Sequence, residues 1–342
     1  MMAAMQLVEF GKPLKQAMVP KPRLRPEDVL VNVKAAGVCG TDLKIIAGNH
    51  PKVPAAALPR ILGHEVAGTV VALGERVSKE HSFLLGKDVV VYFYESCGSC
   101  GFCRSGREPL CEKVVRQYGF TWDGGFAQYM AVAARNVIPF EGLDHHVACI
   151  LADAVGTAYH AVASRAQVKP GELVVILGCG GLGIHAVQVA KLMGAEVIGV
   201  DINRVRIDAA SRFGADRGLE FEELMKNKGS VAADVVVDTI GNSQTVRASL
   251  ELLKKGGRLV VVGYIDGVEQ SVYLARAVKK EICVLGSLAC GFKEVEEVVR
   301  LAMRGKLTPV VGRVFPLSLA NEAIEHVKMA DSAGRVVLSI QE

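Results

Sequence analysis

Residues 173–201 constrain the fold of this chain more than any other segment. The apolar run LVVILG is followed by the glycine-rich stretch GCGGLGIHAVQVAKLMGA and then by a second apolar run, EVIGVD. Strand, glycine turn, helix and strand in this order form a βαβ unit, whose strands are parallel. The alternation continues through DVVVDTIG, the helical stretch QTVRASLELLKKGG, RLVVVGY and ICVLGS. We therefore expect an α/β domain with a doubly wound parallel sheet.

The turn inside this unit has the glycine spacing of a dinucleotide-binding site, G-x-G-x-x-G. The first glycine permits a tight turn, the second lets the backbone approach a pyrophosphate, and the third lets helix and strand pack closely. The helix N-terminus adds backbone N–H groups and a positive dipole end. The alternative is a turn that serves packing alone. The residues that we expect to contact the cofactor here are Gly178, Gly180, Gly181, Leu182 and Gly183.

Asp201 ends the second strand of the unit, about 20 residues beyond the turn, where a carboxylate accepts hydrogen bonds from ribose hydroxyls. Such a carboxylate also repels a 2′-phosphate, so the sequence favours NAD as the cofactor. Arg206 follows closely and is placed to stack on adenine or to tolerate a phosphate, which leaves NADP as the alternative.

Composition narrows the class of protein. Half of the 342 residues are hydrophobic and 22% are charged, an ordinary globular balance that suffices for about two domains. The net charge is only +4 and no Lys/Arg run dominates, so we expect no nucleic-acid partner. No apolar run approaches the roughly 18 residues of a membrane span, and the first residues lack a signal-peptide pattern. We therefore expect a cytoplasmic protein without a membrane partner.

Four cysteines lie within residues 97–111 with the spacing C-x2-C-x2-C-x7-C. Four thiolates this close suit a structural Zn²⁺, which is tetrahedral and takes Cys or mixed Cys/His ligands. An iron–sulfur cluster also uses short cysteine runs and remains an alternative. Disulfides need an oxidising compartment that nothing in the sequence indicates. We expect the zinc ligands to be Cys97, Cys100, Cys103 and Cys111.

A second set of metal-ligating residues lies nearer the start of the chain, among short Val-rich runs typical of a β-rich domain. GVCGTDL contains Cys39, and ILGHEVAG contains His64 and Glu65. All three side chain types are competent zinc ligands. Taken one at a time, such residues are more often buried core residues than ligands.

Together these features resemble, along nearly the whole chain, the zinc-dependent alcohol dehydrogenases of the medium-chain dehydrogenase/reductase superfamily. GHEVAGTVVALGERV has that family's zinc signature, G-H-E-x2-G-x5-G-x2-V. The C-G-T-D segment, the four cysteines, DGGFAQYM and the glycine turn also follow in the family's order. The resemblance implies a β-rich, GroES-like catalytic domain with a zinc-binding lobe, formed by residues 1–154 and 289–342. It implies a Rossmann-type NAD-binding domain at residues 155–288.

The resemblance also implies how the catalytic zinc is held. In this family the ligands are a Cys in the C-x-[ST]-D segment, the His of G-H-E and a third residue just before the cofactor domain. These positions match Cys39, His64 and Asp153, where many relatives have Cys as the third ligand and some microbial ones have Asp. Glu65 matches a residue that ligates zinc when the substrate or water position is vacant.

Other roles near the zinc are implied in the same way. Thr41 matches the hydroxyl that takes the proton of the alcohol, and Asp42 matches a carboxylate that orients the zinc histidine. Thr157 matches a nicotinamide contact. Phe93 stands where the family lines the alcohol pocket, with plain core packing as the alternative, and Arg335 stands where it can reach the cofactor phosphate.

One position departs from the family pattern. Many members have a His five residues after the zinc cysteine, which acts as an outer proton relay, and this chain has Lys44 there. His50 is nearby but its spacing is wrong for that role. We therefore expect the proton to leave through Lys44, water or another group, with a pH dependence unlike that of His-containing relatives.

The implied activity is the reversible, NAD-linked oxidation of an alcohol to an aldehyde or ketone, with zinc as a Lewis acid and Thr41 as proton relay. Two zinc ions per subunit are expected, one catalytic and one structural. A polyol, diol or threonine-type dehydrogenase of the same superfamily is the nearest alternative. Enoyl and quinone reductases are disfavoured because they lack these zinc ligands. A non-catalytic zinc- and NAD-binding redox sensor is the alternative from another class.

The family also pairs its subunits through an edge strand of the cofactor sheet, here within ICVLGS. We expect a homo-oligomer, a tetramer rather than a dimer. The other cysteines lack ligand spacing and are expected to be buried thiols: Cys149, Cys179, Cys283 and Cys290. The sequence leaves the identity of the alcohol open.

Overall fold

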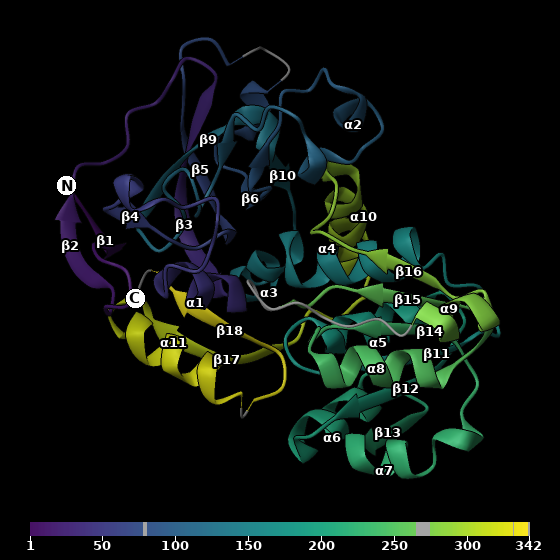
Figure 1. Cartoon of the computed structure of the whole chain (residues 1–342). Coiled ribbons are helices and arrows are strands. Elements are labelled where there is room, and N and C mark those ends of the chain that lie inside the picture. The colour runs from purple at the N-terminus through teal and green to yellow at the C-terminus, as the bar shows by residue number, and fades with distance from the viewer. Residues whose placement is uncertain (78–80, 265–273, 331, 341–342) are drawn as a thin grey trace.

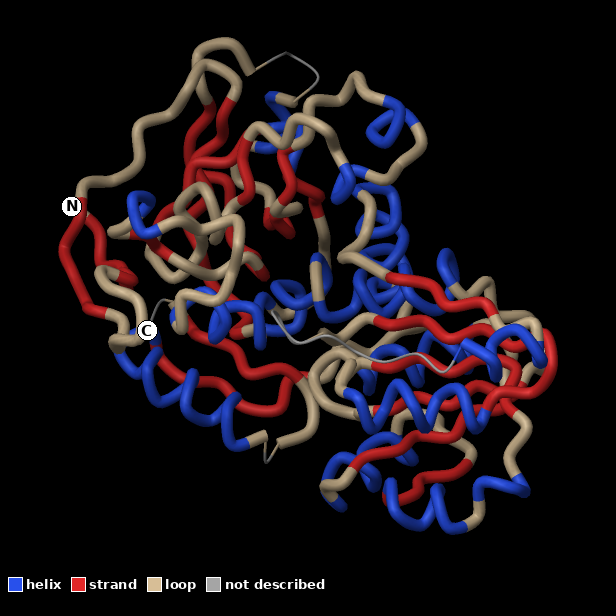
Figure 2. The backbone as a smooth tube through the Cα atoms, viewed as in Figure 1, coloured by secondary structure: helices blue, strands red, loops and turns tan. Residues whose placement is uncertain are grey.

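The computed structural model describes residues 1–77, 81–264, 274–330 and 332–340. Figure 1 shows a β-rich part, which contains both termini, beside an α/β part that contains the middle of the chain. Figure 2 shows the two groups of strands, with helices between and around them. The predicted combination of a GroES-like domain and a Rossmann-type domain is confirmed in outline by these two groups of strands.

The cofactor sheet has six strands in the described residues, and every neighbouring pair is parallel. Alternate residues of its central strand point to opposite faces. Val174 and Ile176 join the core on one face, and Val175 and Leu177 join a second core on the other. The order is β13 (Arg217–Glu220), β12 (Glu196–Asp201), β11 (Leu173–Leu177), β14 (Ala233–Asp238), β15 (Leu253–Val261) and β16 (Cys283–Gly286).

Helices cover both faces of this sheet, as the doubly wound pattern predicts. Residues of α5 belong to the same core as Val174, whereas residues of α7 and α8 belong to the core of Val175. The helices of this part are α5 (Gly183–Leu192), α6 (Arg204–Arg212), α7 (Phe221–Lys226), α8 (Ser243–Leu252) and α9 (Leu274–Lys280).

The catalytic part is built on a mixed sheet in which only the β17–β18 pair is parallel among its described strands. The chain returns to this sheet at its end, because β18 lies between β3 and β17. The order is β10 (Val137–Pro139), β6 (Asp88–Val91), β5 (Glu65–Leu73), β3 (Asp28–Val38), β18 (Arg335–Ser339) and β17 (Val311–Pro316), with β9 (Tyr129–Ala133) also paired to β3.

Smaller elements complete this part of the molecule. One small sheet contains β2 (Lys15–Val19), β1 (Met2–Leu7) and β4 (Arg60–Ile61), and another contains β7 (Tyr94–Glu95) and β8 (Arg116–Gln117). The helices are α1 (Gly40–Ile46), α2 (Gly101–Arg104), α3 (His145–Ala148), α4 (Ala154–Tyr159), α10 (Phe292–Met303) and α11 (Ala320–Met329). A π-helical turn, His160–Arg165, continues α4.

Among the residues that the structure describes, no single helix is long and apolar enough to cross a membrane. One bent pair, His145–Ala152 with Ala154–Arg165, has the length and composition of a span only when its two helices are taken together.

Two details differ from the sequence prediction. Strand β15 begins at Leu253, so residues expected to end a helix belong to a strand, with Gly256 at φ 72° in the bend. Cys283 was expected to be buried, and this was wrong because it lies exposed on the edge strand β16, which pairs on one side only among the described strands. The other three cysteines without ligand spacing are buried. The domain boundaries at 154/155 and 288/289 stay a prediction.

Candidate active site

Four possible zinc ligands from distant parts of the chain lie in one buried cluster. Cys39 directly precedes α1, His64 and Glu65 lie at the start of β5, and Asp153 directly precedes α4. One donor atom from each lies within 4.8 Å of the others. Cys39 Sγ is 3.5 Å from Asp153 Oδ2, which is 3.6 Å from His64 Nε2. The structure brings together the ligands that the resemblance implied, and their role as ligands stays a prediction.

Asp42 lies behind the histidine of this cluster. Its Oδ2 accepts a hydrogen bond of 2.8 Å from the backbone N–H of Cys39, and its Oδ1 is 3.6 Å from His64 Nδ1. A carboxylate beside one ring nitrogen orients an imidazole so that its other nitrogen faces a metal. Here the other nitrogen, Nε2, faces Asp153, so Asp42 occupies the place that its predicted role requires.

The donor set fits a catalytic zinc ion. Thiolate, imidazole and carboxylate are the groups that hold zinc in such sites. One oxygen of the cluster, Glu65 Oε2, is buried and has no hydrogen-bond partner among the described residues. Because a buried polar group without a partner is costly, this oxygen fits a site that is completed by a metal.

Arg335 holds the carboxylates of the cluster from behind. Its Nη2 donates to Glu65 Oε1 at 2.7 Å and to Asp153 Oδ2 at 3.1 Å. Glu65 Oε1 also accepts from the backbone N–H of Ala154 at 3.1 Å, and Asp153 Oδ1 accepts from the Thr157 hydroxyl at 2.8 Å. The predicted contacts of Arg335 with a cofactor phosphate and of Thr157 with nicotinamide stay predictions. In the structure both side chains position the carboxylates.

The two carboxyl groups differ in their protonation. Burial raises the pKa of Glu65 to about 8, although Arg335 opposes this. Burial also disfavours the charged form of Asp153, but His64 and Arg335 hold its pKa well below the usual value. The two pKa shifts thus run in opposite directions, which suits Asp153 as the permanent ligand and Glu65 as the occasional one.

Aromatic rings close one side of the cluster. The Phe93 ring centroid lies 5.1 Å from that of His64, and the Phe120 ring lies 5.0 Å from it. Phe93 is buried, so it packs against the cluster, and its contact with an alcohol stays a prediction. Phe120 was missed in the sequence because no local motif surrounds it. The Thr41 hydroxyl lies 3.6 Å from Cys39 Sγ, beside the cluster.

The four clustered cysteines form a separate lobe around α2. One sulfur from each lies within 4.8 Å of the others, with Cys97 and Cys103 at 3.8 Å and Cys100 and Cys103 at 3.4 Å. Tetrahedral zinc with bonds of about 2.3 Å places its sulfurs about 3.8 Å apart. Backbone N–H groups donate to Cys111 Sγ at 3.3 and 3.4 Å. The geometry fits a structural zinc ion.

The glycine turn has the close approaches that its spacing predicts. Gly178 has φ 87°, and a Cβ at Gly183 would lie 1.7 Å from the Gly178 carbonyl oxygen. Asp201 accepts hydrogen bonds of 2.8 Å from the backbone N–H of Cys179 and Ile202. This carboxylate therefore fixes the turn, and its contact with ribose stays a prediction.

Two arginines lie over the turn. Arg206 Nε donates to the Ser332 carbonyl at 3.1 Å, and its guanidinium carbon is 3.5 Å from where a Cβ of Gly180 would lie. Arg335 Nη1 is 3.3 Å from where a Cβ of Gly181 would lie. Arg335 thus lies between the turn and the metal cluster. Glycine at these two positions leaves the space beside both guanidinium groups open.

Lys44 lies in a contact that the sequence does not reveal. Its Nζ donates to the Tyr264 carbonyl at 2.8 Å and lies 3.5 Å from the centre of the Tyr264 ring. Lys44 belongs to α1 of the catalytic part, and Tyr264 follows β15 of the cofactor sheet. The residue at the relay position therefore connects the two parts of the molecule.

A glycine turn after a parallel strand, next to a buried Cys/His/Asp cluster, defines a zinc- and dinucleotide-dependent dehydrogenase. Comparison with known proteins gives the family. Residues 25–142 match the alcohol dehydrogenase GroES-like domain, and residues 181–304 match the zinc-binding dehydrogenase domain. The chain belongs to the zinc-type alcohol dehydrogenases of the medium-chain dehydrogenase/reductase superfamily.

Relatives cover almost the whole chain. The NAD-dependent alcohol dehydrogenase of Sulfurisphaera tokodaii is 33% identical over 98% of this chain and 99% of its own. The cobalt- and zinc-bound thermostable alcohol dehydrogenase of Pyrobaculum aerophilum is 32% identical, with a TM-score of 0.91 over 99% of both chains.

Other relatives carry different names. The L-galactonate-5-dehydrogenase of Escherichia coli is 33% identical over 86% of this chain and 85% of its own. The acryloyl-coenzyme A reductase of Sulfurisphaera tokodaii is 30% identical over 94% of both chains. The family is therefore plain, and its members differ in substrate.

Proposed function

We propose that this protein catalyses the reversible oxidation of an alcohol to an aldehyde or ketone with reduction of NAD. The observation that carries the proposal is the buried set of Cys39, His64 and Asp153, with the Thr41 hydroxyl 3.6 Å from Cys39 Sγ. The names of the alcohol dehydrogenase relatives support the same reaction.

Each side chain of the cluster has a role in this reaction. Cys39, His64 and Asp153 would hold the zinc ion, and Arg335 keeps Asp153 ionised and in place. The chemistry supplied by bound zinc is Lewis acidity toward the substrate oxygen, and that supplied by bound NAD is hydride acceptance. Thr41 would accept a hydrogen bond from the substrate hydroxyl and relay the proton, giving up its own hydroxyl proton toward solvent as it takes that of the substrate. Burial of the cluster excludes water from the reacting groups.

The proposal includes the cofactors and the assembly. Asp201 at the end of β12 supports NAD in preference to NADP. The two separate donor sets support two zinc ions per subunit, one catalytic and one structural. The edge strand β16, with its exposed Cys283, is the surface through which a homotetramer would form. The cytoplasm is the proposed compartment.

A second candidate is a dehydrogenase of a more polar substrate or a reductase of an acyl thioester. It is favoured by the names of two relatives, L-galactonate-5-dehydrogenase and acryloyl-coenzyme A reductase. Oxidation of any alcohol, polar or not, needs the metal to activate the hydroxyl oxygen, whereas reduction of the C=C bond of an enoyl thioester does not. Loss of activity with zinc therefore separates the reductase from the dehydrogenases, and a panel of substrates separates the dehydrogenases from one another.

The test is NAD⁺ reduction at 340 nm against primary and secondary alcohols, diols, polyols, sugar acids and threonine. Zinc content is measured on the same protein before and after chelation. Activity that disappears with about one labile zinc per subunit, and returns on zinc addition, supports the proposal. Activity that survives full loss of zinc from the buried cluster contradicts it.

A further inference from the structure

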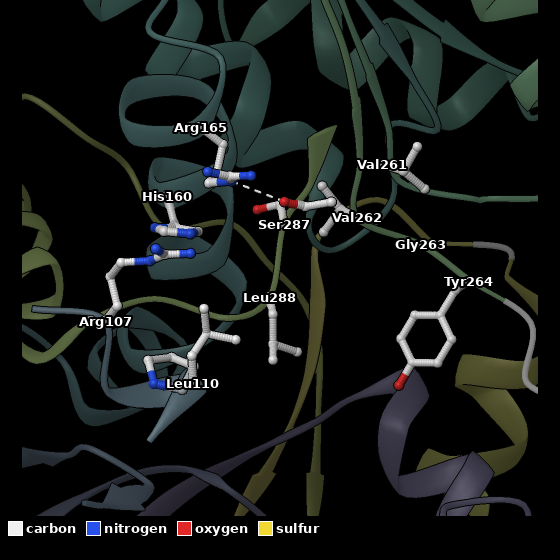
Figure 3. A pocket seen from close by; sticks show the side chains of 13 residues that line it. Arg107, Leu110, His160, Arg165, Val261, Val262, Gly263, Tyr264, Ser287 and Leu288 are labelled. Carbon is white, nitrogen blue, oxygen red and sulfur yellow. Dashed lines mark hydrogen bonds between the residues drawn. The ribbon is translucent and has the colours of Figure 1, made fainter. Parts of the chain in front are cut away.

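A pocket of about 460 Å³ opens where the carboxyl ends of β15 and β16 meet the cysteine lobe. In open parallel sheets, ligands bind outside the carboxyl ends of the strands. Figure 3 shows three basic side chains along one side of the pocket, Arg107, His160 and Arg165. The apolar side chains of Val262 and Leu288 lie across from them. The pocket thus has a cationic side and an apolar side.

The two arginines have no carboxylate partner among the residues that the structure describes. Arg165 donates only through Nε, to the Gly286 carbonyl at 2.9 Å, which orients its terminal nitrogens without neutralising them. The Arg107 guanidinium lies 5.4 Å from the centre of the Phe102 ring. A guanidinium presents a fork of donors that matches carboxylate and phosphate oxygens.

Two carboxylates adjoin the pocket, but other groups already hold them. Glu294 accepts from His160 Nδ1 at 2.9 Å and from the Gly291 backbone N–H at 2.7 Å. Glu108 accepts from the Phe292 backbone N–H at 3.2 Å. Neither carboxylate is among the residues that line the pocket.

The pocket borders the proposed active site on two sides. Gly291, in its wall, follows Cys290, whose thiol donates to the Ala152 carbonyl at 3.3 Å, next to Asp153. Tyr264, in the opposite part of the wall, accepts a hydrogen bond from Lys44. The pocket wall is thus continuous with residues that contact the proposed active site, so a molecule whose reacting carbon lies at the metal cluster can place its far end in this pocket.

We propose that this pocket binds an anionic group, a carboxylate or a phosphate, at the far end of the substrate. Arg107 and Arg165 pair with the anion, and Val262 and Leu288 cover the carbons that connect it to the reacting centre. The substrate would then be an anionic alcohol or its carbonyl form. This inference rests on the proposed function and names the substrate class within it.

The experiment uses the zinc-loaded enzyme with NADH and aldehydes that end in a carboxylate, with two to six methylenes between the groups. Each aldehyde takes a hydride from NADH and a proton, giving the alcohol and NAD⁺. Each is compared with the amide of the same length, which is neutral, and a parallel series ends in a phosphate ester. We expect kcat/KM to favour the anion by roughly tenfold to a hundredfold at one optimal length. The better of the two series identifies the natural anion.

Variants locate the effect in the pocket. Arg107→Gln and Arg165→Gln should each lower the anion-to-amide ratio of kcat/KM by about tenfold, and the double variant should remove the preference. Arg107→Lys keeps the charge and should keep part of the preference. Arg76 is an exposed arginine outside the pocket. The variant Arg76→Gln is the matched control and should change neither kcat/KM for the anion nor kcat/KM for the amide. If the two arginines had only a structural role, the variants would lower kcat/KM for the anion and for the amide equally, and the ratio of the two would stay unchanged.

Binding without turnover separates this proposal from the proposed function. Benzoate, phenyl phosphate and benzamide are titrated calorimetrically into the NAD complex of the wild type and of the double variant. Tighter binding of an anion that is lost in the double variant supports the pocket even if no aldehyde is reduced, in which case the proposed function alone fails. Equal kcat/KM for anion and amide at every length, or anion binding unchanged in the double variant, overturns the inference.

Discussion

The cysteine lobe and the buried cluster each gather four metal-ligating groups, but they are assembled in opposite ways. The lobe takes its four sulfurs from 15 consecutive residues, Cys97 to Cys111, and all four of these cysteines are only half-buried in the fold. The buried cluster takes Cys39, His64 and Asp153 from segments that lie far apart in the chain. A local site of this kind holds its own loop together, whereas a site built from several segments depends on the whole fold.

The two sites also differ in the chemistry of their ligands. Four thiolates close a tetrahedron and leave no position for a substrate. A thiolate, an imidazole and a carboxylate leave one position open, which is the arrangement of catalytic zinc. The comparison therefore predicts that damage to the buried cluster abolishes activity, while damage to the lobe mainly lowers stability.

The largest effect is expected for Cys39→Ala. Loss of one ligand removes the Lewis acid from the reacting oxygen, which contributes about 4 kcal/mol, so kcat/KM should fall about 10³-fold. Steady-state kinetics and zinc content per chain measure this. Ser230→Ala, which removes an exposed hydroxyl that donates to the Asn227 carbonyl, is the control. If the Cys39→Ala enzyme keeps two zinc ions per chain and a kcat/KM within tenfold of the wild type, Cys39 is not a ligand of a catalytic zinc.

Cys103→Ser tests the other half of the comparison. We expect one zinc fewer per chain and a loss of about 3 kcal/mol in the free energy of unfolding, a fraction of what a structural zinc contributes. Activity toward a short neutral alcohol should stay within about tenfold. Thermal unfolding and metal analysis are the measurements. Ser105→Ala, whose hydroxyl bonds only to the Phe102 carbonyl among the described residues, is the control. Complete loss of activity with unchanged stability would reverse the assignment of the two sites.

The same contrast explains what the sequence could predict. The βαβ alternation and the cysteine spacing are local patterns, and both the parallel sheet and the lobe follow from them. Arg335 is 270 residues from the Glu65 side chain that it contacts, so no local spacing reveals this pair. Cys283 was expected to be buried because it lacks ligand spacing, yet it lies exposed on β16, the strand already expected at an edge of the sheet. The sequence pattern predicted the place of this strand but did not decide which face of it is covered.

Arg335→Met tests the long-range support of the buried cluster. Its loss leaves Asp153 and Glu65 without their shared donor, and hydrogen bonds to charged groups contribute roughly 2 to 3 kcal/mol. We expect the free energy of unfolding to fall by that amount and zinc affinity at the buried site to fall with it. Arg313→Met, on the neighbouring strand β17 with its guanidinium over Phe315, is the matched control. Equal effects of the two variants would contradict a special role for Arg335.

His185 provides a second long-range contact, and this one depends on pH. Its Nδ1 bonds to the Gly181 carbonyl and its Nε2 accepts from the Val310 N–H, both at 2.8 Å. Burial lowers the pKa of His185 to about 3, with Arg335 adding to the effect. The pKa of His185 in the folded protein lies below the unfolded value of about 6.5. The contribution of the neutral imidazole to the free energy of unfolding is therefore complete above about pH 6.5 and is lost as pH falls toward about 3.

The stability advantage of the wild type over His185→Gln should therefore shrink by about 2 kcal/mol between pH 7 and pH 5. Denaturant unfolding at a series of pH values measures it. The same comparison with His146→Gln, a partly exposed residue on α3, is the control. A difference that stays constant over this range would show that the imidazole is not held neutral by the fold.

Lys44 gives the smallest expected effect and separates two roles for one residue. Its Nζ donates to the Tyr264 carbonyl across the two parts of the molecule, so we expect Lys44→Met to weaken the contact between these parts by about 1 kcal/mol. The KM for NAD should then rise about fivefold, with the pH profile of kcat unchanged. Lys87→Met, an exposed lysine paired with Glu141, is the control. If the pH profile of kcat shifts while the KM for NAD stays constant, Lys44 is a proton relay, as its sequence position indicates, and the contact with Tyr264 is incidental.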